Sequence, residues 1–426
     1  MSHADALFET ALGDYLGMKN DPVASLSAAI EADPDFIIGH TSIAALNCLG
    51  GVPGQDEAVR APLAAAEARA GQATKRERLH IAAARAWADG DITGAATHWE
   101  SALADDPADI FSLRLAHDTH FFLGALPKLR DVPLSVLDAY RPGTRERGFV
   151  LGMAAFGLEE LGDYEAGEAA GREAVEINPA DSWGIHAVAH VLEMQGRVRD
   201  GTDWLRGLEP HWTAANGLAV HQWWHLTLYR LEAGAFDEVL AIYDDHIRAT
   251  PASIVLDLVD AAALLWRLEL AGVDVGARWR DLAAFWGVHA QEHVLAFNDL
   301  HIAMTYSGAD DRGAADRLEA SIQEYIGHEQ GTNAAVSRSL GLPVIQALRA
   351  FRDGDYARTA TLLRPLYKHL APVGGSNAQR DLIVQTLGVA ACKAGDLALA
   401  GEVAAERRRL KMGSPRAWAA HEALRQ

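Results

Sequence analysis

The sequence of 426 residues has only two cysteines and no long uncharged apolar run. Cys48 and Cys392 lie far apart in apolar settings, so buried thiols in a reducing compartment are expected rather than a disulfide framework. The longest apolar stretch, residues 254–272, contains four charged side chains and therefore predicts a buried helix, not a membrane span. The N-terminus lacks the basic start and apolar run of a secretory signal. These absences predict a cytoplasmic protein.

Basic side chains are also scarce, since 58 acidic residues stand against 38 basic ones and give a formal charge of −20. This charge repels phosphate backbones and anionic lipids, so neither nucleic acid nor a membrane is expected as a partner. The most basic stretch, Arg407 to Arg409 with Lys411, is interpreted as a solvated face or as the positive end of a final helix. A small-molecule ligand is the expected partner, and a homodimer is left open.

Alanine and leucine supply most of the apolar content, which is 49% of the residues, while aromatic residues make up only 7%. Alternating runs of valine, isoleucine and threonine are nearly absent, so the composition favours closely packed helices over strands. A chain of this length exceeds the usual size of one compact core. The sequence therefore predicts several helical domains or a helical repeat.

Three segments repeat one pattern of a small-residue helix, a polar residue, a proline and a new helix. They are AAIEADPDF, SALADDPADIF and EAVEINPADSW, and their prolines are Pro34, Pro107 and Pro179. The prolines are 73 and 72 residues apart, close to twice the period of about 34 residues of tetratricopeptide repeats. A proline and its preceding residue end one helix and set the turn into the next.

A second recurring signal is a glycine followed by a polar or small residue within each expected hairpin, where glycine supplies a left-handed helix cap. It occurs at Gly90, Gly162, Gly234, Gly354 and Gly395. The two signals together predict an all-α fold, an α-solenoid of stacked antiparallel helical hairpins that forms a tetratricopeptide-like superhelix. Such stacks commonly bind partners on their concave face.

We expect one continuous domain over residues 1–426. Its N-terminal repeats cover residues 1–126, its histidine-rich central repeats residues 145–305 and its C-terminal repeats residues 306–426. Linkers are expected at residues 50–56, 127–144 and 371–377.

Histidine clusters in the middle of the chain, where 11 of the 18 histidines fall between His117 and His301. In WGIHAVAHVLEMQGR, the spacing places His186, His190 and Glu193 within about 60° of one another on a helix. In HQWWHLTLYRLEAG, His221 and His225 also share a face. The chain has three histidine pairs at i, i+4, whereas about 0.75 are expected by chance.

Two further segments, AHDTHFFLG and FNDLHIAM, carry histidine beside polar residues on other expected helices. Imidazoles and a carboxylate on one helix face form part of a shell for a divalent metal. The candidate ligands are His117, His186, His190, His221, His225 and His301. Histidines on an apolar helix face also serve as hydrogen-bonded core groups, and this alternative stays open. The H-x-x-E-H match that begins at His289 is interpreted as a chance match.

The segment VGGSNAQRDLIVQTL places two glycines before Ser376, which is a good N-cap for the helix that follows. The amides at that helix start and the Arg380 side chain are suited to hold a carboxylate or phosphate. The alternative is a simple cap with Arg380 and Asp381 as a surface pair.

These segments, with DLVDAAALLWRLELAG, resemble the tetratricopeptide repeat protein 38 family over residues 115–388. The resemblance implies a tetratricopeptide-like helical fold and brings no settled reaction with it. The family has histidine after GGS, where this chain has Asn377.

The main functional hypothesis is a hydrolase in which a divalent metal (Zn, Mn or Fe) activates water against a small polar or anionic substrate. Its catalytic residues would be Glu193, Asp118 and His120. Its substrate-binding residues would be Arg380, Ser376, Asp381, Trp183, Trp223, Trp224 and Asn298. The alternatives are a non-catalytic scaffold that binds a peptide or protein partner, and metal-free acid–base chemistry on histidine and aspartate.

Overall fold

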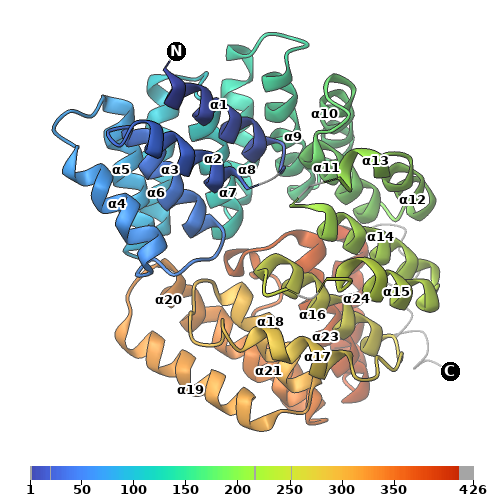
Figure 1. Ribbon diagram of the computed structural model, residues 1–426. Helices are drawn as coiled ribbons and strands as arrows, with labels where there is room; N and C mark the ends of the chain where they lie inside the picture. Colours follow the sequence, from blue (N-terminus) through green and yellow to red (C-terminus); the bar gives the residue numbers. More distant parts are fainter. Residues whose placement is uncertain (1, 20, 215–216, 251, 412–426) are drawn as a thin grey trace. The chain divides into compact units, whose positions relative to one another are not determined.

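Every regular element that the structure describes is helical (Figure 1). The structure is a computed structural model and describes residues 2–19, 21–214, 217–250 and 252–411. The chain divides into two compact units. Unit 1 comprises residues 1–188, 208–219 and 330–333, and unit 2 comprises residues 189–207, 220–329 and 334–426. The single continuous domain stays a prediction.

Unit 1 is built from consecutive helices that pack in pairs, such as α1 with α2, α3 with α4 and α5 with α6. Short turns join the members of each pair, so the paired helices run antiparallel. The bounds are α1 His3–Leu16, α2 Pro22–Ala32, α3 Ile37–Leu49, α4 Glu57–Ala68, α5 Lys75–Ala88, α6 Ile92–Asp105, α7 Ile110–Leu123, α8 Leu126–Val136, α9 Arg145–Glu160, α10 Tyr164–Ile177 and α13 Glu209–Trp212.

The division between the units passes through α11, Ser182–Met194. Unit 2 continues the paired arrangement, for example α21 with α22 and α23 with α24. Its bounds are α12 Val198–Gly207, α14 Ala219–Ala233, α15 Phe236–Ile242, α16 Val255–Leu270, α17 Arg278–Trp286, α18 Ala296–Gly308, α19 Arg312–His328, α21 Leu342–Arg352, α22 Tyr356–Leu363, α23 Asn377–Lys393 and α24 Leu397–Leu410. The short α20, Thr332–Val336, also spans the division. The predicted all-α fold of stacked helical hairpins is confirmed within each unit.

The three proline segments form equivalent turns between successive hairpins, as the repeat predicts. The residue before each proline is the C-cap of the preceding helix and has an extended backbone; these residues are Asp33, Asp106 and Asn178. In each turn the side-chain oxygen of this residue accepts a hydrogen bond from the backbone amide two residues later. The repeated sequence pattern therefore forms the same local structure at three places in the chain.

The hairpin glycines adopt the left-handed conformation that the sequence predicts. Their φ angles are 86° at Gly90, 83° at Gly162, 76° at Gly234, 80° at Gly354 and 77° at Gly395. A side chain at these positions would be strained, so glycine is required for the turn.

The linker expected at residues 127–144 is wrong, because most of it is helical. Helix α8 begins at Leu126, and Pro127 lies in its first turn, where the missing amide hydrogen costs no hydrogen bond. Pro133 falls within the same helix.

The apolar stretch around residues 254–272 forms α16, whose middle is buried from Leu258 to Leu268. Its charged residues Asp260 and Arg267 are 0% and 5% exposed. Among the helices described here, none has both the length and the apolar character to span a membrane. The free thiols of Cys48 and Cys392 are both buried.

The contact between Asp109 and Arg76 in unit 1 is expected to be sensitive to acid. Asp109 precedes α7, and its carboxylate accepts hydrogen bonds from the Arg76 guanidinium at 2.6 and 2.8 Å. Burial alone would raise the pKa of Asp109, but Arg76 and Ser112 outweigh it and lower the pKa from 3.8 to about 2. The lowered pKa stabilises the fold above about pH 4, and this stability is lost as the pH falls towards 2.

We therefore expect Asp109→Asn to cost about 2 kcal/mol of unfolding free energy near neutral pH and almost nothing near pH 2. Asparagine keeps the helix cap and removes the charge. Urea unfolding followed by tryptophan fluorescence at a series of pH values measures the difference. Asp105→Asn, which removes an exposed pair with Lys75, is the control. A loss that does not change with pH would contradict the assignment.

Candidate metal centre

Three histidines converge inside unit 2. His190 comes from α11, and His221 and His225 lie one turn apart on α14. The ring centroids are 4.3 Å apart for His190 and His225, and 4.8 Å apart for His221 and His225. One ring nitrogen from each histidine lies within 4.8 Å of the others. His190 and His225 are 0% exposed, so the group is fully enclosed by protein.

His186 precedes His190 by one turn on the same helix and is also buried. It falls in unit 1, whereas His190, His221 and His225 fall in unit 2.

Two buried carboxylates orient the α14 histidines. Nδ1 of His221 lies 2.8 Å from Oδ2 of Asp260, and Nδ1 of His225 lies 3.2 Å from Oε2 of Glu193. A carboxylate only accepts hydrogen bonds, so each Nδ1 carries the hydrogen and each Nε2 keeps its lone pair. Histidines that bind metals are held by carboxylates in this way.

His190 and His225 of this group are held in the uncharged form, which can bind a metal cation. Burial lowers the pKa of His190 far below its ordinary value, and the neighbouring His225 adds to the effect. Burial likewise lowers the pKa of His225, with a contribution from His221. Both rings are therefore neutral at pH 7, which is the form that binds metal.

Glu193 links the histidines to the end of α24. Its Oε1 accepts a hydrogen bond from Nζ of Lys411 at 2.8 Å, so both carboxylate oxygens have a partner. Lys411 is only 6% exposed. Burial would lower its pKa, but Glu193 and Glu232 outweigh this and raise it. The interpretation of the basic run as a solvated face is therefore wrong for Lys411 and for Arg407, which are both buried.

Aromatic and cationic side chains enclose the group from α14 and α16. Trp224 stacks on His221 with a centroid distance of 5.1 Å, and Arg267 lies over the Trp224 ring at 5.4 Å. Trp223 instead stacks on His246 at 3.7 Å, beside Arg206. Trp224 therefore contacts the histidine group directly, whereas Trp223 packs on a different histidine.

His301, on α18, is buried, and its Nδ1 donates a hydrogen bond to the carbonyl oxygen of Phe297 at 2.7 Å. Burial lowers the pKa of His301 to about 4. Within the described part of unit 2, His301 does not join the histidine group of α11 and α14. Asn298 is half-buried in the first turn of α18.

The residues predicted around α23 lie at its first turns. Ser376 caps the helix and forms a capping box with Gln379. Arg380 donates hydrogen bonds to the Gly375 carbonyl and, at 2.9 Å, to the side chain of Asn377. Asp381 accepts two hydrogen bonds from Arg407, at 2.7 and 2.8 Å. These contacts fit a cap with internal pairs, and a role in substrate binding stays a prediction.

The remaining predicted residues belong to unit 1. Asp118 accepts hydrogen bonds from the Tyr15 hydroxyl at 2.6 Å and from Arg114 at 2.9 Å. Nε2 of His120 lies 2.8 Å from the carboxylate of Glu100. The structure thus gives Asp118 and His120 different partners. Their catalytic roles stay predictions.

Two other predicted residues of unit 1 pack together. The rings of His117 and Trp183 lie edge to face with a centroid distance of 5.8 Å. Arg114 lies over the Trp183 ring at 4.8 Å. His117 therefore packs against an aromatic side chain of its own unit.

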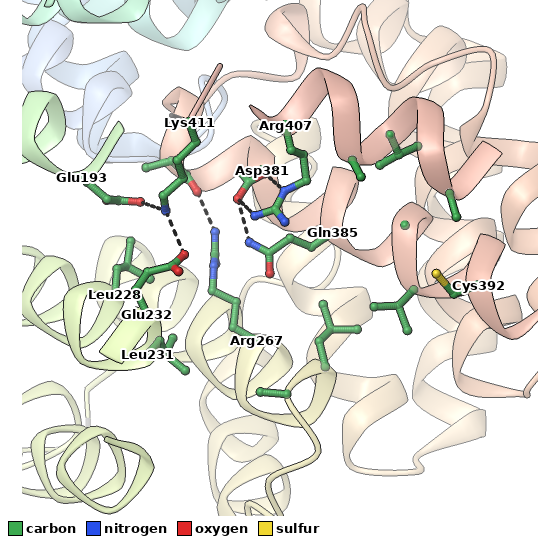
Figure 2. A pocket seen from close by; sticks show the side chains of 18 residues that line it. Glu193, Leu228, Leu231, Glu232, Arg267, Asp381, Gln385, Cys392, Arg407 and Lys411 are labelled. Atoms are coloured by element: carbon green, nitrogen blue, oxygen red, sulfur yellow. Dashed lines mark hydrogen bonds and ion pairs between the residues drawn. The ribbon is translucent and has the colours of Figure 1, made fainter. Parts of the chain in front are cut away.

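A cavity of about 150 Å³ lies beside Glu193 in unit 2 (Figure 2). Its charged lining residues are Glu193, Glu232, Arg267, Asp381, Arg407 and Lys411. The sequence prediction missed Asp260, which holds His221, and it missed Arg267 and Lys411, which line the cavity. For Asp260 and Arg267 the available signal was a charged residue in an otherwise apolar helix.

No family model matches the chain. The similar solved structures include a human IFIT1 dimer with m7Gppp-AAAA, with 15% identity over 100% of this chain and 95% of that chain and a TM-score of 0.45. They also include yeast Tom70, with 12% identity, 99% and 96% coverage and a TM-score of 0.37. A third is the TPR domain of P58(IPK), with 13% identity, 93% and 99% coverage and a TM-score of 0.22.

Proposed function

We propose that this helical-repeat protein binds a divalent transition metal, best zinc, in unit 2. One observation carries the proposal: His190, His221 and His225 converge, and buried carboxylates hold Nδ1 of two of them. The Nε2 atoms of these two rings are then the donors, and imidazole nitrogen suits zinc.

A binding scaffold is the role that we propose for the protein as a whole. Stacked helical hairpins present extended surfaces to a peptide or protein partner. A metal enclosed by four protein ligands has no open position for water and serves to hold the fold together. Membership of the tetratricopeptide repeat protein 38 family is proposed from the segments quoted above.

Metal-assisted hydrolysis is the second candidate, and it is favoured by the cavity that reaches Glu193. It requires an open coordination position, which exists only if the protein supplies no fourth ligand to the metal. Glu193 already bonds His225 and Lys411, so we assign it the positioning of His225 rather than proton transfer. The ligand number of the bound metal separates the two candidates.

The supporting carboxylate provides the test. We expect Asp260→Asn to weaken zinc binding by about 10- to 100-fold, which is the usual effect of removing a carboxylate that orients a metal-binding histidine. The amide cannot hold the Nδ1 hydrogen of His221 as the carboxylate does, so the ring loses its fixed orientation. Competition with a chromogenic chelator measures the affinity.

Asp257→Asn is the matched control, since Asp257 lies one turn earlier on α16 and forms no hydrogen bond with a histidine among the residues that the structure describes. Its zinc affinity should equal that of the natural protein. Equal zinc affinity in Asp260→Asn and Asp257→Asn would overturn the proposed site.

A further inference from the structure

The lining of the cavity beside Glu193 is partly apolar and partly charged. Helices α14, α16, α23 and α24 surround it, and Figure 2 shows Leu228 and Leu231 on the side opposite Cys392. The apolar lining residues are Leu228, Leu231, Leu270, Val389, Val403 and Ala404. A lining of this kind suits a ligand with a hydrocarbon part and one polar end.

The charged residues of the lining are unequally paired. Asp381 pairs with Arg407, while Lys411 has Glu193 at 2.8 Å and Glu232 at 3.5 Å. Arg267 is the third cation of the lining. No carboxylate of the described residues lies within 4 Å of its guanidinium nitrogens.

Arg267 donates hydrogen bonds to two backbone carbonyls, that of Ala263 at 3.2 Å and that of Ala378 at 2.6 Å. A guanidinium has five hydrogen-bond donors, and its planar fork matches a carboxylate. Because the side chain is only 5% exposed, water does little to compensate its charge. Burial lowers the pKa of Arg267, although Asp381 and Glu193 oppose this. An anion in the cavity would complete its surroundings.

We propose that this cavity binds a short aliphatic monocarboxylate, with the carboxylate on Arg267 and the hydrocarbon chain against Leu228, Leu231 and Val403. A cavity of this volume holds a molecule about the size of benzene, which corresponds to roughly four to six carbons. Glu193 and Glu232 also line the cavity and repel an anion with more than one charge, such as phosphate. The site does not depend on the metal proposed for the histidines.

Calorimetric titration of the full-length protein tests the ligand class. Hexanoate should bind, 1-hexanol should bind at least about tenfold more weakly because it lacks the charge, and inorganic phosphate should give no binding heat. Equal affinity for hexanoate and hexanol, tighter binding of phosphate, or no binding of hexanoate at millimolar concentration would each overturn the proposal.

Two variants locate the site. Arg267→Gln removes the cation and should lose hexanoate binding. Gly388→Leu should also lose it, since Gly388 lines the cavity and a Cβ there would lie 3.4 Å from Val403, at ordinary contact distance. This substitution leaves every charge in place and favours the helix.

Gly327→Leu on α19 is the matched control, because a Cβ there meets open space. If Arg267→Gln fails to fold by circular dichroism, Gly388→Leu decides the question. Unchanged hexanoate affinity in folded Gly388→Leu would overturn the proposal. Zinc content measured on the same variants keeps this result separate from the metal site, since Gly388→Leu should retain zinc.

Discussion

Replacing His190 and His225 with alanine together should remove the bound zinc, reducing it from one ion per chain to none. The substitution deletes two of the three converging rings and leaves Glu193 without the imidazole that it orients. The loss should exceed the 10- to 100-fold effect of removing a supporting carboxylate, so we expect affinity to fall by more than about 100-fold. Plasma mass spectrometry on protein purified without chelators or a histidine tag measures the metal content.

The control for this variant removes the same number of imidazoles from the surface of unit 2. His328 and His369 are both exposed, so His328→Ala with His369→Ala should keep the full zinc content. Circular dichroism shows whether each double variant is folded. A folded His190/His225 variant that retains one zinc per chain would place the metal elsewhere and refute the site.

Replacing Asp381 with alanine should cost about 3–5 kcal/mol of unfolding free energy, since it removes the carboxylate that shares two hydrogen bonds with the buried Arg407 guanidinium. The side chains of Arg407 and Asp381 are 8% and 14% exposed and share two hydrogen bonds. Arg407 also lowers the pKa of Asp381 well below its ordinary range, although burial acts in the opposite direction. Urea denaturation followed by circular dichroism measures the change.

Glu406→Ala is the comparison, since Glu406 lies next to Arg407 on α24. Glu406 pairs with Arg409, whose side chain is 67% exposed, and such surface pairs contribute at most about 1 kcal/mol. If Asp381→Ala costs no more than Glu406→Ala, the buried pairing at the end of α24 does not stabilise unit 2 as described.

The local signals of the repeat could be predicted from the sequence because each reports a backbone requirement. Pro34, Pro107 and Pro179 end helices through the geometry of the residue before proline, wherever the hairpin lies. Gly90 and Gly162 lie at positions whose positive φ angles favour glycine. These requirements are local, so the hairpins were recoverable without knowing how they pack.

The histidine group was predictable only in part. Spacing of four residues places His221 and His225 on one face of a helix, which needs no tertiary information. The contact of His190 with His225 depends instead on how α11 packs against α14. The helical period cannot give that packing, because the crossing of two helices is set by all the side chains between them.

The sequence prediction missed Asp260, Arg267 and Lys411 because it used their charges only as evidence against a membrane span or for a solvated surface. Asp260 and Arg267 are seven residues apart and share a face of α16, which marks a polar stripe within an apolar helix. Arg407 and Lys411 are four residues apart, and both are buried, while Arg408 and Arg409 between them are exposed. Reading the basic run by helical face, rather than by total charge, would have separated these two pairs.

X-ray absorption spectroscopy at the zinc edge, on the natural protein loaded with one equivalent of zinc, tests the central claim most directly. We expect a shell of nitrogen atoms at about 2.0–2.1 Å from the zinc, together with the more distant scattering of the imidazole rings. Four nitrogen ligands would indicate a closed site that supports the scaffold, and three with one oxygen would favour hydrolysis. A shell that contains sulfur, a shell of oxygen alone, or failure to bind stoichiometric zinc would contradict the histidine site.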